Sequence, residues 1–226
     1  MSPSAVAYGA NLETQARQSL GVSSDPIYRM VARALDAHRI GRGRLIDVGC
    51  GSGGLWRVTG SRFSSYCALD AVRYDGLPSD ADFHQIDLNS DCWPSVAAGD
   101  VVAAVETIEH VENPWAFMRH LSQLAKPGGW VVVTTPNQLS FLSLLTLFLK
   151  QRFSAFPDAH YPAHRTALLP SDLCRAASEA GLQVVEASYS LRGRAPLTGT
   201  HYPAFVSRSF PRVFSDNMMV VARKGV

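Results

Sequence analysis

The chain has 226 residues, which is long enough for one α/β domain with a substantial buried core. It carries 21 Lys and Arg against 19 Asp and Glu, a formal net charge of +2, and 46% of its residues are hydrophobic. The charge balance excludes the basic surface typical of nucleic-acid-binding proteins, and the hydrophobic content excludes a disordered chain. We therefore expect a globular domain without a nucleic acid partner.

The spacing of the cysteines and the first residues of the chain indicate the cellular compartment of the protein. Cys50, Cys67, Cys92 and Cys174 are too far apart for a CxxC pair and too few for a disulfide scaffold. The first residues lack the basic region and continuous apolar segment of a signal peptide. Both observations predict reduced cysteines and a cytoplasmic location.

The predicted elements begin with two helices, over 5–20 and 26–39, ahead of the first strand. From residue 44 onward, short apolar runs alternate with helical patterns, which is typical of a parallel sheet wound with helices. The expected strands are 45–48, 66–69, 83–86, 101–104, 130–134, 182–187 and 218–222.

Two helices between these strands have clear end signals. One begins at Asn113-Pro114 and ends at the Lys-Pro-Gly-Gly turn of 126–129. Another is expected over 171–180, where a Ser-Asp pair can cap its start. The irregular stretch 188–217 is longer than a usual hairpin loop, so we expect it to be functional or packed over a site.

A glycine-rich turn follows the strand 45–48, with the sequence Gly-Cys-Gly-Ser-Gly-Gly over 49–54. Glycines allow a tight turn and let a ligand approach the main chain closely. Asp70, 21 residues after Gly49, stands at the end of the next strand, where a carboxylate can bind the hydroxyls of a ribose. The same spacing matches the dinucleotide-binding pattern, so the turn alone leaves an NAD-dependent oxidoreductase open.

Further acidic residues favour a cationic cofactor. Asp47 lies inside the first strand, Asp87 follows the strand 83–86, where an adenine amino group could donate to it, and Glu106 follows the strand 101–104. Such a cluster attracts the sulfonium and ammonium groups of S-adenosylmethionine and repels the phosphates of a dinucleotide.

Taken in order, these motifs resemble those of class I S-adenosylmethionine-dependent methyltransferases. The resemblance is close over 44–137, where 47–53 is similar to the first motif of the family and 126–129 to its turn before the fifth strand. It implies an α/β, Rossmann-like fold: a doubly wound, mostly parallel sheet of seven strands with an antiparallel last strand. It also implies S-adenosylmethionine as cofactor, with S-adenosylhomocysteine as product. The cofactor-binding residues expected on this basis are Asp47, Gly49, Cys50, Gly51, Gly53, Asp70, Ala71, Asp87, Leu88 and Glu106.

We expect a single domain over 1–226, because no repeat or linker divides the chain. Residues 1–43 would form a helical cover and 44–137 the cofactor-binding core. Residues 138–170 would form an insertion on the acceptor side, followed by a C-terminal helix and strands over 171–226.

His110 is the predicted catalytic residue, because it follows the fourth strand near the expected methyl group and could orient or deprotonate an acceptor. The pentapeptide Glu106-x-x-Glu109-His110 resembles a motif of ubiquinone-biosynthesis O-methyltransferases that is associated with a divalent metal. A structural helix entrance explains the motif equally, so no metal site is predicted. His160 and His164 are alternative bases, although ordinary loop roles are favoured for both.

The apolar segment 139–149 has Leu144 and Phe148 on one stripe, with Lys150 and Arg152 beside it. Ubiquinone-biosynthesis O-methyltransferases are similar in carrying an apolar, membrane-touching segment at this place. The segment is therefore predicted to roof a lipophilic acceptor or touch a membrane peripherally. A lid packed on the core or a contact between subunits is the alternative, and the oligomeric state stays open.

The predicted function is O-methylation of a small molecule or a glycan intermediate. Within the same family, methylation of a quinone precursor or N-methylation of a small molecule is the alternative. From other classes, an NAD-dependent oxidoreductase or a non-catalytic cofactor-binding module remains open.

Overall fold

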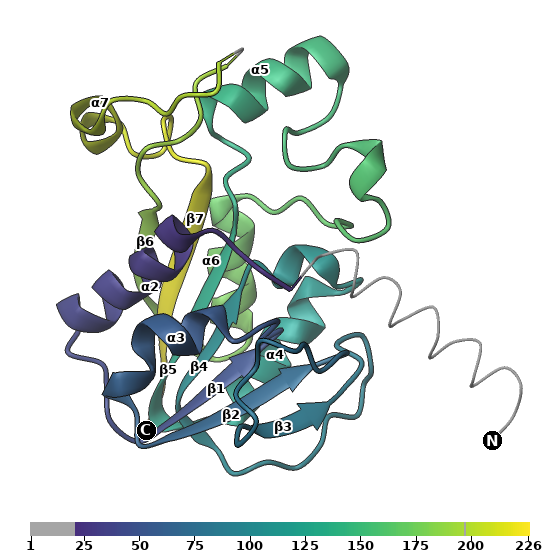
Figure 1. Ribbon diagram of the computed structural model, residues 1–226, viewed down its shortest axis with the longest axis vertical. Helices are drawn as coiled ribbons and strands as arrows, with labels where there is room; N and C mark the ends of the chain where they lie inside the picture. Colours follow the sequence, from purple (N-terminus) through teal and green to yellow (C-terminus); the bar gives the residue numbers. More distant parts are fainter. Residues whose placement is uncertain (1–20, 197) are drawn as a thin grey trace, which may run out of the picture.

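The computed structural model describes residues 21–196 and 198–226 (Figure 1), so the helix expected over 5–20 lies outside the described residues. One seven-stranded sheet has the order β3-β2-β1-β4-β5-β7-β6. Only β7 runs antiparallel, to both β5 and β6, which confirms the predicted α/β fold. The strands are β1 Arg44–Val48, β2 Ser65–Asp70, β3 Asp82–Gln85, β4 Gly99–Val105, β5 Ala125–Pro136, β6 Leu182–Tyr189 and β7 Asn217–Lys224.

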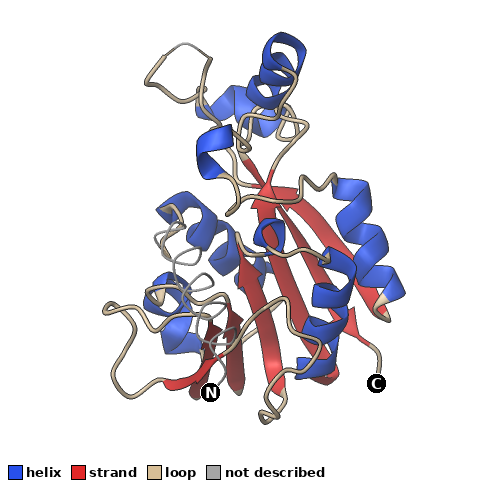
Figure 2. Ribbon diagram, turned by 90° about the vertical axis from the view of Figure 1, so that its right-hand side faces the viewer, coloured by secondary structure: helices blue, strands red, loops and turns tan. Residues whose placement is uncertain are grey.

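Helices cover both faces of this sheet (Figure 2). They are α2 Asp25–Ala37, α3 Gly54–Thr59, α4 Pro114–Leu124, α5 Phe141–Lys150, α6 Pro170–Glu179 and α7 Ala204–Ser209, with 3₁₀ turns η1 Gly60–Arg62, η2 Ile108–His110 and η3 Asp158–His160. Apolar residues of α4 and α6 pack on one face of the sheet, and those of α2 and α3 pack on the other. Because β1 and β4 contribute to both clusters, their side chains are buried on both faces, as expected for central parallel strands.

The bounds of the elements differ from the predicted ones, and two of these differences concern predicted helix ends. Helix α6 begins one residue early, at Pro170, with Leu169 as its N-cap, and the Asp172 carboxylate caps this start by accepting the N–H of Leu169 at 3.1 Å. The turn 126–129 belongs to the long strand β5, because Ala125 already pairs with Gly99 ahead of an irregularity in the β4–β5 register. By contrast, Asn113 caps α4 as expected, accepting the N–H of Ala116 at 3.0 Å.

Helices α5 and α7 lie together at the end of the molecule beyond the carboxyl ends of the strands (Figure 1). The N–H of Phe141 at the start of α5 donates to the carbonyl of Val213, and the Asn137 side chain donates to the carbonyl of Arg212. The long stretch after β6 is therefore packed against the segment after β5. None of the helices in the described part of the chain has the length and apolar content needed to span a lipid bilayer.

Candidate functional site

A cavity of about 280 Å³ lies at the carboxyl ends of β1, β2 and β4. The predicted site residues that line it are Asp47, Gly49, Cys50, Gly51, Asp70, Ala71, Asp87, Leu88, Glu106 and His110. Gly53 is not among the lining residues; it has a φ of 76° at the start of α3 and lies against Leu77. Its role in the turn is conformational, because an added Cβ would lie 3.3 Å from the side chains of Leu77 and Pro78.

The glycine turn is enclosed by protein on two sides. A Cβ on Gly49 would lie 2.4 Å from the side chain of Thr107, and one on Gly51 would lie 2.1 Å from the carbonyl oxygen of Gly21. That same carbonyl accepts the N–H of Ser52 at 2.8 Å. The segment before α2 is thus fastened over the turn, a contact that no motif in the sequence signals.

The Asp47 carboxyl is buried beneath the cavity, with 2% of the residue exposed. The Tyr66 hydroxyl donates to its Oδ2 at 3.0 Å. Burial raises the pKa of Asp47 to about 7, and the neighbouring Asp70 charge adds to the effect. No Lys or Arg within residues 21–196 and 198–226 forms an ion pair with it. Among these residues the carboxylate has no cationic partner, and it therefore suits a cationic ligand.

Asp70 ties the end of β2 to the glycine turn. Its Oδ2 accepts the N–H of Gly51 at 2.8 Å, and its Oδ1 accepts that of Val72 at a longer distance of 3.4 Å. Burial raises the pKa of Asp70, and these backbone donors oppose that shift. The carboxylate is held in place with acceptor capacity left for ligand hydroxyls.

Glu106 and Glu109 form an acidic pair after β4, in which Glu109 is buried and Glu106 is half-buried. Glu106 has a φ of 52°, and its carboxylate accepts Thr134 Oγ1 at 2.8 Å and Asn217 Nδ2 at 2.6 Å. Burial raises the pKa of both acids, that of Glu109 to about 8, and repulsion from Glu109 raises that of Glu106 further. The strained backbone at Glu106 persists because these neighbours hold the residue in place.

Two histidines meet at the cavity, the predicted base His110 and the alternative base His164. Nδ1 of His110 lies 2.7 Å from the carbonyl of Ala163, and Nδ1 of His164 lies 2.6 Å from that of Ala155. A carbonyl only accepts, so Nδ1 carries the proton in each neutral ring and Nε2 is left as the acceptor. Burial lowers the pKa of His110, and burial together with His110 lowers that of His164 to about 4. An ordinary loop role was favoured for His164. In the structure the insertion brings the centre of its ring to 4.8 Å from that of His110, and His164 lines the cavity.

The same corner contains a group of residues that could hold a metal ion. One ligand atom from each of Glu109, His110 and His164 lies within 4.8 Å of the others. Glu106 does not belong to this group, and its two oxygens already accept Thr134 and Asn217. The possible ligand set thus differs from the one that the pentapeptide suggested.

Helix α5 turns its polar side to the protein and its apolar side outward. Ser143 is buried and its hydroxyl accepts the N–H of Ser154, whereas Leu144 and Phe148 are 44% and 84% exposed. The alternative of a lid whose apolar stripe packs on the core is therefore wrong. The insertion reaches the cavity through 162–164 instead.

The chain matches known proteins at the level of sequence and of fold. A family model described as a methyltransferase domain matches residues 23–187. A protein of Burkholderia pseudomallei named ubiquinone biosynthesis O-methyltransferase is 31% identical over 162 residues, which are 66% of this chain and 68% of that protein. A protein of the same name from Bordetella bronchiseptica is 29% identical over 150 residues, 62% of each chain.

Solved structures share the fold at low sequence identity. An S-adenosylmethionine-dependent methyltransferase from Clostridium acetobutylicum has a TM-score of 0.60 at 10% identity, covering 91% of this chain and 93% of its own. Another from Archaeoglobus fulgidus has a TM-score of 0.59 at 15% identity, covering 87% and 94%. The seven-stranded sheet with its antiparallel β7 is therefore a fold shared with these enzymes.

Proposed function

Because the chain belongs to the S-adenosylmethionine-dependent methyltransferase family, we propose that it transfers a methyl group to a hydroxyl oxygen of a small molecule. The observation that carries this proposal is the pair His110 and His164, each with an unprotonated Nε2, at the cavity that Asp47 and Asp70 also line. A hydroxyl must lose its proton during transfer, so it needs such a base, whereas a neutral amine does not need one to attack. Membership of the family also removes the oxidoreductase alternative that the glycine turn left open.

The lining residues fit the chemical groups of this cofactor. Asp70 would bind the ribose hydroxyls and Asp87 with Leu88 the adenine, while Asp47 would balance the positive charge of the amino acid end. The main chain of the glycine turn would pack closely against the ligand. When bound, S-adenosylmethionine supplies an electrophilic methyl group on its sulfonium.

The remaining groups would handle the proton of the acceptor. His110 would accept it at Nε2, since its Nδ1 is engaged with a backbone carbonyl and its ring orientation is thereby fixed. His164, whose pKa of about 4 keeps it neutral, would position the acceptor by a hydrogen bond. Glu106 would hold the strand end through Thr134 and Asn217 and close the cavity floor.

The test is to replace the proposed base. With hydroxylated aromatic compounds as acceptor probes, His110→Ala should lower turnover by about 100-fold or more while S-adenosylhomocysteine affinity stays unchanged. His84→Ala, on the edge strand β3, is the matched control and should keep wild-type turnover. Full turnover by the His110 variant, or methylation of amine probes alone, would reject the proposal. Since no metal takes part in it, EDTA should leave turnover unchanged.

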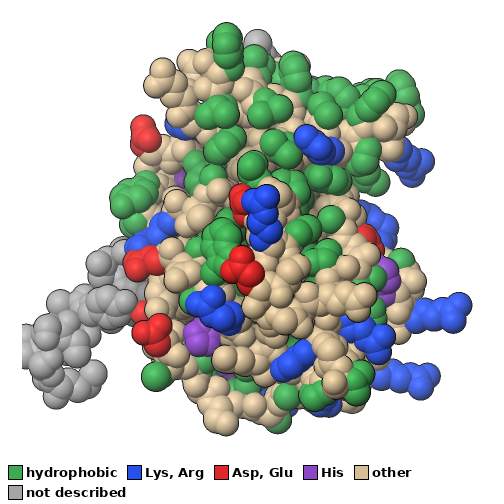
Figure 3. All heavy atoms as spheres, turned by 180° about the vertical axis from the view of Figure 1, so that it is seen from behind, with side chains coloured by type: hydrophobic (Ala, Val, Ile, Leu, Met, Phe, Trp, Pro, Cys, Tyr) green, Lys and Arg blue, Asp and Glu red, His purple; other side chains and the backbone are tan. Residues whose placement is uncertain are grey.

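A lipophilic acceptor such as a quinone precursor, taken from a membrane surface by a cytoplasmic protein, is the second part of the proposal. It is supported by the exposed apolar side of α5, next to Lys150 and Arg152, and by hydrophobic side chains that gather at the same end of the molecule (Figure 3). The name of the relatives that the chain resembles agrees with this class of acceptor.

Leu144→Ser combined with Phe148→Ser should abolish sedimentation with anionic vesicles, because both side chains lie on this exposed surface. S-adenosylhomocysteine affinity and melting temperature should stay near those of the wild type, since neither residue lines the cavity. The control Val58→Ser with Val185→Ser removes two exposed apolar side chains elsewhere. Equal vesicle binding by all three proteins would contradict the membrane contact.

A further inference from the structure

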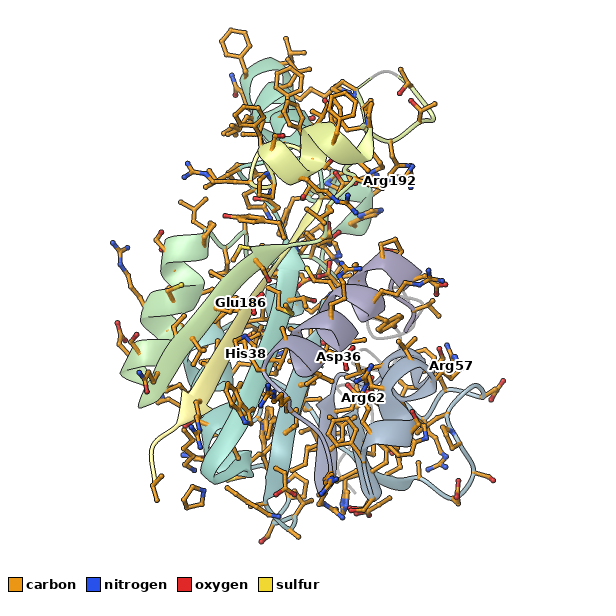
Figure 4. The ribbon with its side chains drawn as sticks, turned by 90° about the vertical axis from the view of Figure 1, so that its left-hand side faces the viewer. Asp36, His38, Arg57, Arg62, Glu186 and Arg192 are labelled. Atoms are coloured by element: carbon orange, nitrogen blue, oxygen red, sulfur yellow. The ribbon has the colours of Figure 1, made fainter. Side chains whose placement is uncertain are left out.

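A second cavity, of about 500 Å³, lies on the other side of α2 from the cofactor site. Ile27 and Tyr28 of α2 line the first cavity, whereas Arg29 and Arg33 of the same helix line the second. The opposite wall comes from 190–192 after β6 and from α7. In Figure 4, Arg192 lies between α7 and α2. Three segments far apart in the sequence therefore enclose this space.

The cavity has a strong excess of positive charge. Arg29, Arg33, Arg192 and Arg208 line it, and Asp25 is the one carboxylate among its lining residues. Asp25 lies 3.6 Å from Arg29 on the same helix, in an exposed pair. Among the residues that the structure describes, no carboxylate forms an ion pair with the other three arginines.

Some ionisable side chains on the same side of the molecule do have an acidic partner. Arg194 Nε lies 2.8 Å from Asp216, and His38 Nε2 lies 2.6 Å from Glu186 (Figure 4). Bringing four guanidinium groups to one hollow that a single carboxylate also lines costs free energy, and an anion between them relieves that cost. The cavity is thus a place where arginine side chains gather with one carboxylate among the lining residues.

The backbone that carries Arg192 is held in an unusual conformation. Leu191 and Arg192 have φ values of 61° and 59°, a region that residues other than glycine rarely occupy. The N–H of Leu191 donates to Ser215 Oγ at 3.0 Å, and that of Gly193 donates to the carbonyl of Phe214 at 2.7 Å. These bonds fix a strained turn whose side chain lines the cavity.

We propose that this cavity binds the phosphate or diphosphate group of a ligand. Guanidinium groups match phosphate oxygens with paired, charge-assisted hydrogen bonds, and four of them suit a group with more than one negative charge. The phosphate can belong to a soluble compound or to a lipid headgroup, since α7 also exposes Phe205 at its outer side. Binding here requires no methyl transfer and goes beyond the function proposed above.

Titration calorimetry with inorganic pyrophosphate at low ionic strength tests the site. Arg33→Gln combined with Arg192→Gln should weaken binding by about tenfold or more, because two of the four guanidinium groups that line the cavity are lost. The control Arg119→Gln with Arg175→Gln removes the same charge from the exposed sides of α4 and α6. It should bind as the wild type does. Equal loss in both double variants would overturn the proposal, since that result reflects net charge alone.

A vesicle arm distinguishes the source of the phosphate. If the wild type fails to bind pyrophosphate but sediments with phosphatidylcholine vesicles only when they contain phosphatidic acid, and the Arg33 and Arg192 variant does not, the ligand is a lipid headgroup. Binding to neither probe overturns the proposal. S-adenosylhomocysteine should bind all variants equally, so failure of the cofactor site is recognised separately.

Discussion

The Asp47 carboxyl is placed to bind a cationic ligand, and its burial lowers the stability of the folded protein when no ligand is bound. It is buried in β1, with the Tyr66 hydroxyl as donor and no cationic partner in the described ranges. Its pKa is raised from 3.8 to about 7, so the folded state binds the proton more tightly than the unfolded state does. As the pH rises from about 4 to 7, the free energy of unfolding therefore falls. Above about pH 7 the folded state bears the whole free-energy penalty of the buried, ionised carboxylate.

Asp47→Asn should therefore raise the free energy of unfolding of the cofactor-free protein by about 1–4 kcal/mol at about pH 8, and by much less at about pH 5. Its S-adenosylhomocysteine affinity should fall, because the ligand ammonium loses its counter-charge. Urea denaturation at both pH values and calorimetry measure the two effects. Asp80→Asn, at an exposed position, is the control and should change neither. If the Asn variant is less stable than the wild type at about pH 8, the ionised Asp47 carboxylate is stabilised by its surroundings in the cofactor-free protein, which contradicts the prediction.

At the scale of elements, the glycine turn and the segment before α2, which lies over it as a cover, are in direct contact through Gly21. The sequence pattern predicted a tight turn that a ligand can approach closely. It did not predict the segment that lies over the turn, because a motif contains no information on distant segments. In the structure, the carbonyl of Gly21 occupies the space beside Gly51 that any side chain would need. Substitution at Gly51 should thus disturb the cover as well as the ligand.

Gly51→Ala is the smallest test of this contact. The added methyl group would lie 2.1 Å from the Gly21 oxygen, so the cover must shift and S-adenosylhomocysteine affinity should fall by about tenfold or more. Gly181→Ala is matched in backbone, since Gly181 has a φ of 76° with nothing within 4 Å. That control should lose about 1 kcal/mol of stability without loss of affinity. Equal affinities in the two variants would contradict the role of the cover.

The elements also mark what the sequence pattern could and could not predict. The apolar runs predicted all seven strands. They are clearest in β1, β2 and β4, because buried parallel strands are apolar almost throughout, whereas β3 and β6 are only partly buried. The amphipathic pattern of α5 predicted two faces but not which one meets the protein. That choice depends on Gln138 and Ser154, which hydrogen-bond with the buried Ser143 hydroxyl.

At the scale of the whole molecule, the topology explains which part of the site was predictable. Parallel strands end at one edge, so Asp47, Asp70 and Glu106 were expected to lie near one another, and all three line the cavity. Tyr28 and His164 line it too, but they come from the cover and the insertion. Their positions depend on tertiary packing, which no local periodicity encodes.

Helix α2 lies between the two cavities, and the segment before it contacts the glycine turn. We therefore expect cofactor binding to slow amide exchange in this segment and in the first turn of α2. The N–H of Ser23 donates to the Tyr28 hydroxyl, and the carbonyl of Gly21 accepts Ser52, which links this segment to the glycine turn. A ligand held between the turn and its cover must suppress the opening that exposes these amides. We expect S-adenosylhomocysteine to slow hydrogen exchange over 21–28 several-fold, measured by mass spectrometry. Exchange over α6, on the opposite face of the sheet, should change far less, whereas equal slowing in both regions would indicate global stabilisation without a closing cover.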